Sequence, residues 1–166
     1  MLNTVYRLVE PRRIESEFSN IDVNGDSVLV RPTHLSICNA DQRYFQGTRP
    51  PEVLKKKLPM ALIHEAIGEV IYDPTGDFKA GQKVVMVPNT PMEEDDIVAE
   101  NYLRSSKFRA SGFDGFMQDI VAMRRDRVVA VPDGIDDYVA AFTELVSVSY
   151  HAIDRFDRKA HGRRNV

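Results

Sequence analysis

Four side chains of this sequence carry the donor atoms of a zinc site. His64 and Glu65 are adjacent and begin an apolar run that reaches Val70, Cys38 is the only thiol of the chain, and Glu144 offers a second carboxylate. Catalytic zinc commonly takes three protein ligands from cysteine, histidine and carboxylate side chains, and it keeps one position for water or substrate. A lone cysteine is more often a small buried hydrophobe, and a lone histidine or glutamate is usually structural or solvated. The hypothesis to be tested is that Cys38, His64, Glu65 and Glu144 converge on one metal ion.

Short strands separated by turns must position these side chains. Glycine, proline, asparagine and aspartate interrupt runs rich in β-branched and aromatic residues, which predicts strands. Asn24 and Gly25 form a strong hairpin-turn signal, because both residues tolerate a positive φ. The pattern favours an all-β barrel or sandwich decorated by small helices. The expected strands cover residues 4–10, 12–18, 27–31, 68–72, 83–87, 116–123 and 127–131.

Three helical segments are expected beside the strands. Residues 38–47 and 50–57 are predicted to form two short helices, with Cys38 at the N-terminal edge of the first. Unpaired amides and the helix dipole favour a thiolate at such a position. A longer helix with Asp136 or Asp137 as its N-cap is expected towards the C-terminus, because apolar residues recur at helical spacing at positions 138, 141, 142, 145, 148 and 152.

The stretch 89–111 differs from the strands on either side of it. It contains the acidic residues Glu93, Glu94, Asp95 and Asp96 and no compact strand pattern. This predicts a surface excursion, partly helical, with a solvated face.

Composition narrows the class of protein. The chain has 166 residues, of which 43% are hydrophobic and 28% charged, as in one soluble globular domain. A net charge of -3 offers no broad cationic face for nucleic acid. No leader pattern and no run of ~20 apolar residues is present, so a membrane span is not expected. A single cysteine excludes an intramolecular disulfide, and a reducing cytoplasm is the expected location.

Five motifs in order resemble the N-terminal catalytic domain of the zinc-dependent medium-chain alcohol and polyol dehydrogenases. Residues 36–41 read Ser-Ile-Cys-Asn-Ala-Asp, where that family has a motif like Gly-Ile-Cys-Gly-Ser-Asp. Residues 63–70 contain a His-Glu pair before a Gly-x-Val strand, as the family's Gly-His-Glu motif does. The turn 81–84 resembles Gly-Asp-Arg-Val, residues 115–118 stand where Gly-Gly-Phe-Ala is frequent, and residues 144–145 stand at the Glu-Pro-Leu of polyol dehydrogenases. The presence of all five motifs in the same order as in the family indicates this resemblance more specifically than any single motif does.

Within this family the chain is most similar to the ribitol-5-phosphate dehydrogenases, also described as ribulose-5-phosphate reductases. The resemblance implies NADPH-dependent reduction of ribulose 5-phosphate to ribitol 5-phosphate, for cell-wall or capsule polymers. It also implies that Cys38, His64 and Glu144 hold zinc, with Glu65 as a fourth ligand or displaced by water and substrate. A cytidylyltransferase partner and a homodimer are further expectations.

The resemblance also implies roles for residues around the metal. Asp41 would accept the free ring N–H of His64 and fix its tautomer. Tyr44 resembles a tyrosine that lines the substrate pocket of polyol dehydrogenases, although core packing is an equal alternative. A sugar phosphate needs a cationic anchor, for which Arg43, Arg49 and residues 55–57 are candidates, although each could be an ordinary solvated charge.

The chain also departs from the family pattern. Ala40 stands where a serine or threonine usually passes a proton to solvent, so a bound water or Glu65 would have to carry the proton. Ile63 replaces the usual glycine before the histidine, which could shift the backbone at the ligand. The lobe 89–111 lacks the four cysteines of a structural zinc site, so one metal is expected.

The resemblance implies a GroES-like, partly open β-barrel, mainly β with short helices. Residues 1–153 are expected to form the zinc-binding catalytic domain, and residues 154–166 the start of a connection to a cofactor-binding domain. The Gly-x-Gly-x-x-Gly turn that opens a Rossmann domain does not occur, since Gly162 is isolated. We therefore expect a catalytic domain without its nicotinamide-binding partner, inactive in hydride transfer by itself. Apolar residues between positions 138 and 156 would then be exposed and could drive self-association.

Two alternatives remain open at this point. A non-catalytic chaperonin-10-like barrel would use the same strands as an interaction module, with a structural His-Glu pair. A zinc-independent relative of the quinone reductases would require Cys38 and Glu144 to lie far apart in space.

Overall fold

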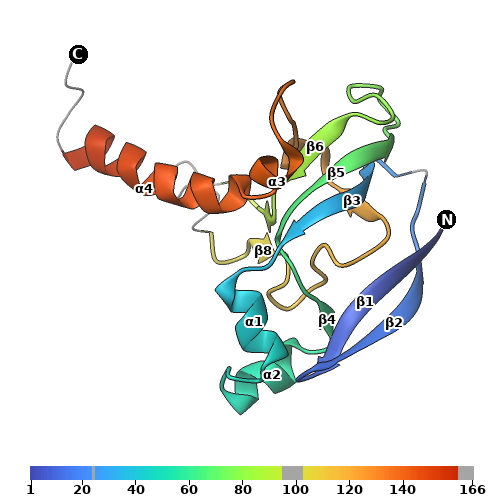
Figure 1. Cartoon of the computed structure of the whole chain (residues 1–166), viewed down its shortest axis with the longest axis vertical. Coiled ribbons are helices and arrows are strands. Elements are labelled where there is room, and N and C mark those ends of the chain that lie inside the picture. The colour runs from blue at the N-terminus through green and yellow to red at the C-terminus, as the bar shows by residue number, and fades with distance from the viewer. Residues whose placement is uncertain (24, 95–102, 161–166) are drawn as a thin grey trace.

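The fold is mainly β, with two short helices at one end and one long helix that projects from the body (Figure 1). A computed structural model describes residues 1–23, 25–94 and 103–160 of the chain. The expected fold class is confirmed. The strands are β1 (Leu2–Glu10), β2 (Arg13–Asn20), β3 (Val28–Ser36), β4 (Met60–Ala61), β5 (Glu65–Tyr72), β6 (Lys83–Met86), β7 (Asn89–Thr90), β8 (Lys107–Phe108), β9 (Val121–Met123) and β10 (Val128–Ala130). The helices are α1 (Asn39–Phe45), α2 (Pro51–Lys57), α3 (Asp137–Ala140) and α4 (Thr143–Ala160), with a 3-10 turn at Arg125–Arg127.

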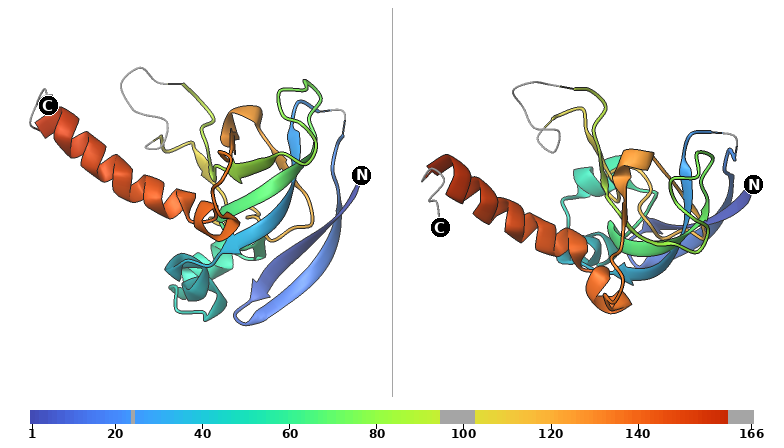
Figure 2. Two further views of the ribbon diagram at one scale, coloured as in Figure 1. Left: turned by 45° about the horizontal axis from the view of Figure 1, so that its top comes forward. Right: turned by 90° about the horizontal axis from the view of Figure 1, so that it is seen from above.

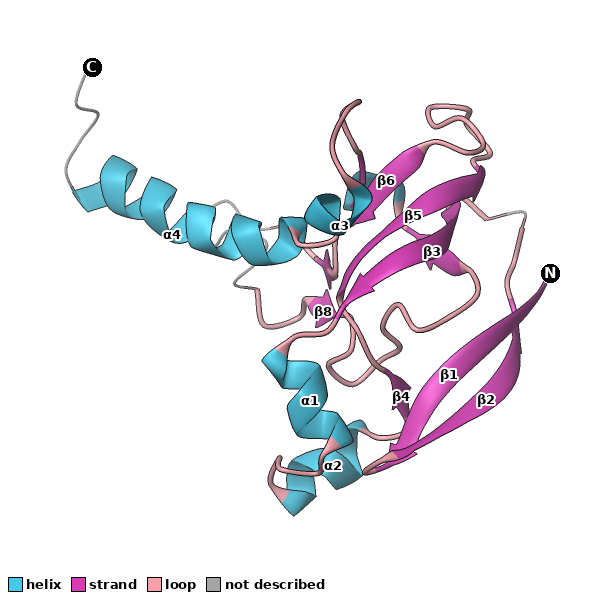
Figure 3. Ribbon diagram, in the orientation of Figure 1, coloured by secondary structure: helices cyan, strands magenta, loops and turns pink. Residues whose placement is uncertain are grey.

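Two antiparallel sheets form a partly open barrel (Figure 3). The larger sheet has the order β10-β6-β5-β3-β9, and the smaller one has the order β2-β1-β4. Strands β2 and β3 belong to different sheets, so the hairpin expected at Asn24 and Gly25 does not pair its flanking strands. Asn24 itself lies outside the described residues. Strand β3 also extends beyond the predicted 27–31, because it pairs with β5 as far as Ser36.

Residues 115–119, which we call the linking segment, hydrogen-bond to the smaller sheet and then lead along the chain into β9 of the larger sheet. Its amides donate to the backbone near β4: Gly115 N–H to Ala61 O at 2.8 Å and Phe116 N–H to Ile63 O at 2.7 Å. On its other side, Tyr6 N–H of β1 donates to Met117 O at 2.9 Å. The strand expected over 116–123 is therefore shorter, since only Val121–Met123 pairs continuously within a sheet.

Each sheet covers its own apolar cluster. Alternating side chains of the larger sheet point inward and meet Phe116 of the linking segment, as period-2 patterning dictates. The smaller cluster lies between β1, β4 and α1, with Leu8 and Met60 completely buried. Buried members of the first cluster are Val28, Val30, Ala66, Val70, Val84, Met86, Phe116, Val121, Met123 and Val128.

The predicted C-terminal helix forms, but as two pieces. Asp136 caps α3 by accepting the amides of Tyr138 and Val139, as expected, and the helix then breaks before α4 begins at Thr143. Helix α4 extends away from both sheets (Figure 2). Its apolar side chains are mostly exposed, as anticipated: Leu145, Val146, Val148, Tyr150, Ile153 and Phe156 are each more than half accessible. Self-association through this surface stays a prediction.

The proposed division at residue 154 falls inside α4, and the last six residues, 161–166, lie outside the described part of the chain. The domain boundary therefore stays a prediction. Among the described residues, no helix combines the length and apolar content needed to cross a bilayer.

Replacing Asp73 with asparagine should lower the free energy of unfolding by about 2 kcal/mol at pH 7. Burial opposes ionisation of this carboxyl, but hydrogen bonds from the Phe78 amide, Arg125 and the Thr75 amide lower its pKa from 3.8 to about 2. Because the pKa is lower in the folded state, this stabilisation is complete above the unfolded-state pKa and is lost as pH falls towards 2. Urea unfolding at pH 7, 4 and 3 measures it.

The matched control for Asp73 is the Asp77→Asn variant. Asp77 also contacts Arg125, but its side chain is 64% exposed, so its removal should cost well under about 1 kcal/mol. The stability difference between wild type and Asp73→Asn should shrink below pH 4. A difference that stays constant down to pH 3 would contradict the assignment.

Candidate metal site

Three of the four residues proposed as metal ligands lie together. Cys38 Sγ is 3.6 Å from His64 Nε2, and His64 Nε2 is 3.8 Å from Glu65 Oε1. The three donor atoms all lie within 4.8 Å of one another. One sulfur, one imidazole nitrogen and one carboxylate oxygen at this spacing fit the requirements of zinc. The residues present therefore suit the implied metal, and their role as ligands stays a prediction.

Cys38 is placed by the junction between β3 and α1. It is the N-cap of α1, as expected, and its Sγ accepts the Ala40 N–H at 3.2 Å. Burial raises the pKa of the Cys38 thiol and outweighs the lowering by backbone hydrogen bonds. The amides at this helix N-terminus lower the pKa of the thiol, as expected from the sequence, but burial and the Asp41 carboxylate outweigh them. A bound cation would supply the missing stabilisation of negative charge.

His64 follows a residue with unusual backbone geometry. Ile63 has a φ of 71°, in the left-handed region that suits glycine, which stands here in the family motif. Two contacts hold this conformation: Ile63 N–H donates to Asp41 Oδ1 at 2.9 Å, and Ile63 O accepts the Phe116 amide at 2.7 Å. The substitution of glycine by isoleucine is thus accommodated by fixing the backbone on both sides.

Asp41 connects the two ligand segments through their backbones. Its Oδ2 accepts the Cys38 N–H at 3.2 Å, while its Oδ1 accepts the amide of Ile63. The carboxylate is 2% exposed. The predicted hydrogen bond from the His64 ring to Asp41 stays a prediction, whereas the contacts described here give Asp41 a clear role in bringing Cys38 and His64 together.

Phe108 covers the imidazole of His64. The two ring centroids are 5.2 Å apart, and the His64 side chain is 12% exposed. Phe108 belongs to β8, which pairs with β7, so this described part of the stretch 89–111 lies at the site. Sequence reasoning placed this stretch on the surface and missed Phe108. Its described acidic residues Glu93 and Glu94 are exposed, as expected, but Asp95 and Asp96 lie outside the described residues.

Glu144 lies in the first turn of α4, beside the three clustered residues but outside their tight group. Burial raises the pKa of its carboxyl, the charge of His64 opposes this, and the charge of Glu65 adds to it. Glu144 is thus close enough to interact electrostatically with His64 and Glu65. This proximity argues against the quinone-reductase alternative, which needs Glu144 remote from the site.

The two residues proposed to bind substrate lie differently. Tyr44 is 5% exposed and packs in the smaller apolar cluster, and the Arg49 guanidinium lies 4.8 Å above its ring. Arg43 is an exposed residue of α1. Core packing therefore accounts for most of the Tyr44 environment, and a substrate role for either residue stays a prediction.

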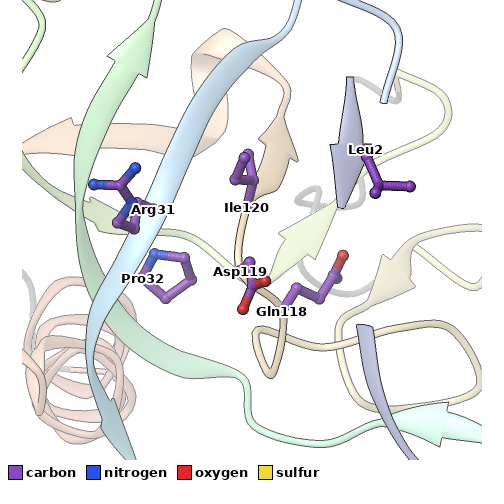
Figure 4. Close-up of a pocket in the computed structure, with 6 residues that line it drawn as sticks. All are labelled: Leu2, Arg31, Pro32, Gln118, Asp119 and Ile120. Atoms are coloured by element: carbon purple, nitrogen blue, oxygen red, sulfur yellow. The ribbon is translucent and has the colours of Figure 1, made fainter. Parts of the chain in front are cut away.

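Two cavities lie near this framework. One of about 480 Å³ is mainly apolar and reaches Ile37, Asp41 and Ile63, which neighbour the candidate ligands. The other, of about 460 Å³, opens between β1 and β3 and contains none of the candidate ligands. Figure 4 shows its lining residues Leu2, Arg31, Pro32, Gln118, Asp119 and Ile120. Of these two cavities, the first borders the candidate metal site.

Comparison with known proteins shows which family and which proteins this chain is similar to. Residues 24–133 match the family described as the alcohol dehydrogenase GroES-like domain. The whole chain is 59% identical to the ribulose-5-phosphate reductase of Bacillus spizizenii and covers 49% of it. With ribulose-5-phosphate reductase 2 of Staphylococcus aureus it shares 59% identity over 160 residues, 96% of this chain and 47% of that protein.

A solved structure shows the same fold. The crystal structure of S. aureus TarJ in complex with NADPH has a TM-score of 0.78 to this chain at 48% sequence identity, and the match covers 96% of this chain and 43% of that one. This chain spans about half the length of the curated relatives it matches.

Proposed function

Because this chain belongs to the family of alcohol dehydrogenase GroES-like domains, we propose that it forms the zinc-binding catalytic half of an NADPH-dependent ribulose-5-phosphate reductase. The observation that carries the proposal is the approach of Cys38, His64 and Glu65 to within 4.8 Å of one another. Two relatives with 59% identity are named for the same reaction, and the similar TarJ structure contains NADPH. The product would be ribitol 5-phosphate, a precursor of cell-wall polymers.

The side chains of this chain would then have distinct tasks. Cys38, His64 and Glu144 hold the metal, and Glu65 completes the set or yields its place to water and substrate. Bound zinc would polarise the substrate carbonyl and stabilise the negative charge that grows on its oxygen during hydride transfer. Since Ala40 offers no hydroxyl, a bound water or Glu65 would carry the proton. Asp41 holds the Cys38 segment next to the His64 segment, because its carboxylate accepts backbone amides from both.

The substrate phosphate and the nicotinamide also need residues that bind them. Arg43 is proposed to contribute to phosphate binding and Tyr44 to line the substrate pocket, whereas the nicotinamide is assigned to the half of the relatives that this chain does not span. We accordingly propose that the chain binds zinc but transfers no hydride by itself. A cytoplasmic location, a homodimer and association with a cytidylyltransferase belong to the same proposal.

The function is tested on the full-length protein and on the chain itself. The full-length protein should oxidise NADPH in the presence of ribulose 5-phosphate, and removal of zinc by a chelator should abolish this activity, with recovery when zinc is returned. The chain itself should bind about one zinc ion. Zinc-free preparations that reject added zinc would instead favour a chaperonin-10-like interaction module.

A further inference from the structure

A buried hydroxyl contacts the carboxylate of Glu65. Ser36 Oγ donates to Glu65 Oε2 at 2.6 Å, and the two residues are 7% and 2% exposed. The other oxygen, Oε1, faces His64 Nε2 at 3.8 Å. The two carboxylate oxygens are therefore directed differently, one towards the serine and one towards the candidate ligands. A buried carboxylate without such a donor would be free to rotate or would require another partner.

The pairing of β3 with β5 creates this contact. Ser36 stands directly opposite Glu65, because β3 contains an extra residue at Thr33, between the pairs Pro32 with Gly68 and His34 with Ile67. Without this bulge, Leu35 would stand opposite Glu65. A shift by one residue moves every following side chain to the other face of a strand, so the bulge determines which side chain meets the carboxylate.

The resulting exposure pattern is the reverse of ordinary hydrophobic patterning. At the end of β3, Leu35 is 41% exposed and Ile37 is 67% exposed, whereas Ser36 between them is buried. Burying a hydroxyl while exposing leucine and isoleucine opposes the usual preference for apolar burial. The arrangement is explained if the inward position must supply a hydrogen-bond donor to Glu65.

We propose that Ser36 is a positioning residue for the metal site, which holds Glu65 Oε2 so that Oε1 is presented to the ion. This rests on the proposed function, since it concerns the same zinc site. The family motif that residues 36–41 resemble has glycine in place of Ser36, so this chain orients its glutamate with a hydroxyl of its own. Ser36 acts through Glu65 and does not itself touch the reacting atoms.

The test is a zinc-competition titration of the full-length protein against a chromophoric chelator, independent of activity. Ser36→Ala should lower zinc affinity ~10-fold to 100-fold, the range found when a hydrogen-bond partner of a metal ligand is lost. In the background of Glu65→Ala the same substitution should have less than about a twofold effect, because its target is gone. Ser16→Ala, an exposed serine of β2, is the matched control and should change nothing.

Cobalt in place of zinc gives a second readout, because the visible absorption of cobalt reports the number and kind of its ligands. Ser36→Ala should alter that spectrum, and Ser36→Gly, which leaves no methyl group, should alter it in the same way. Metal-free Ser36→Ala should remain folded but melt below the wild-type protein, because the buried Glu65 carboxylate has lost a donor.

Three results would overturn the proposal. Equal zinc affinity in wild type and Ser36→Ala refutes it while leaving the proposed function intact. If Ser36→Ala lowers zinc affinity by the same factor in the wild-type protein and in the Glu65→Ala variant, Ser36 does not act through the carboxylate. A wild-type protein that rejects zinc refutes both this inference and the proposed function.

Discussion

The His64→Ala variant should bind zinc more than about 100-fold more weakly than wild type, beyond the loss expected when only an outer hydrogen-bond partner is removed. The reason is geometric: His64 Nε2 lies between the other two donors, 3.6 Å from Cys38 Sγ and 3.8 Å from Glu65 Oε1. Removing the imidazole takes away the nitrogen of the proposed ligand set and leaves one thiolate and carboxylates. Metal content and competition titration measure the effect.

His34→Ala is the matched control for this experiment. The His34 ring packs edge-on against Tyr138, with centroids 5.0 Å apart, and is not part of the metal cluster. Its removal should leave zinc affinity unchanged. Cys38→Ser should behave like His64→Ala, because a hydroxyl is a poor substitute for a thiolate as a zinc ligand. Comparable zinc affinity in wild type and His64→Ala would show that the cluster is not the metal site.

Gly115→Ala should lower the free energy of unfolding by at least about 3 kcal/mol, the upper part of the range for overpacked sites. A Cβ atom at position 115 would lie 2.3 Å from the carbonyl oxygens of Leu62 and Ile63, a distance that no real Cβ contact shows. These are backbone atoms, so they cannot rotate away as a side chain could. The linking segment must separate from the residues before His64, which breaks its hydrogen bonds to Ala61 and Ile63.

Gly25→Ala provides the comparison for Gly115. The nearest atom to a Cβ at position 25 is Asp22 O at 3.9 Å, an ordinary contact. Its unfolding free energy should change by less than about 1 kcal/mol. Urea unfolding of both variants measures the contrast, and zinc affinity should fall only in Gly115→Ala, because Ile63 directly precedes His64. Equal denaturation midpoints for the two variants would rule out the packing argument.

Local signals in the sequence were sufficient for much of the fold. Prolines at positions 50, 51 and 59 mark both ends of α2, and Cys38 could be placed at the start of α1 because strand-forming residues end just before it. Such signals act within a few residues, so they survive in the folded chain. The ordered motifs then pointed to the barrel and to the residues that the structure brings together.

Contacts between segments that are far apart in the chain could not be predicted from such local signals. The bulge at Thr33 determines that Ser36 meets Glu65, yet nothing in residues 28–36 alone reveals the register of the partner strand. Phe108 reaches His64 only because β8 pairs with β7, across an acidic stretch without strand character. Likewise, the linking segment makes hydrogen bonds both to the residues around β4 and to β1. The strand expected over 116–123 is therefore interrupted there.

Helix α4 connects the candidate metal site to a point far from both sheets. Glu144 lies at the root of this helix, just after the break that follows α3, and the helix has 18 residues, which corresponds to a length of ~27 Å. Tilting a helix of this length by ~10° at its N-terminal end would move its far end by ~5 Å. The same tilt would displace the Glu144 carboxylate by only a fraction of that distance. The orientation of α4 therefore affects where the Glu144 carboxylate lies relative to His64 and Glu65, with which it interacts electrostatically.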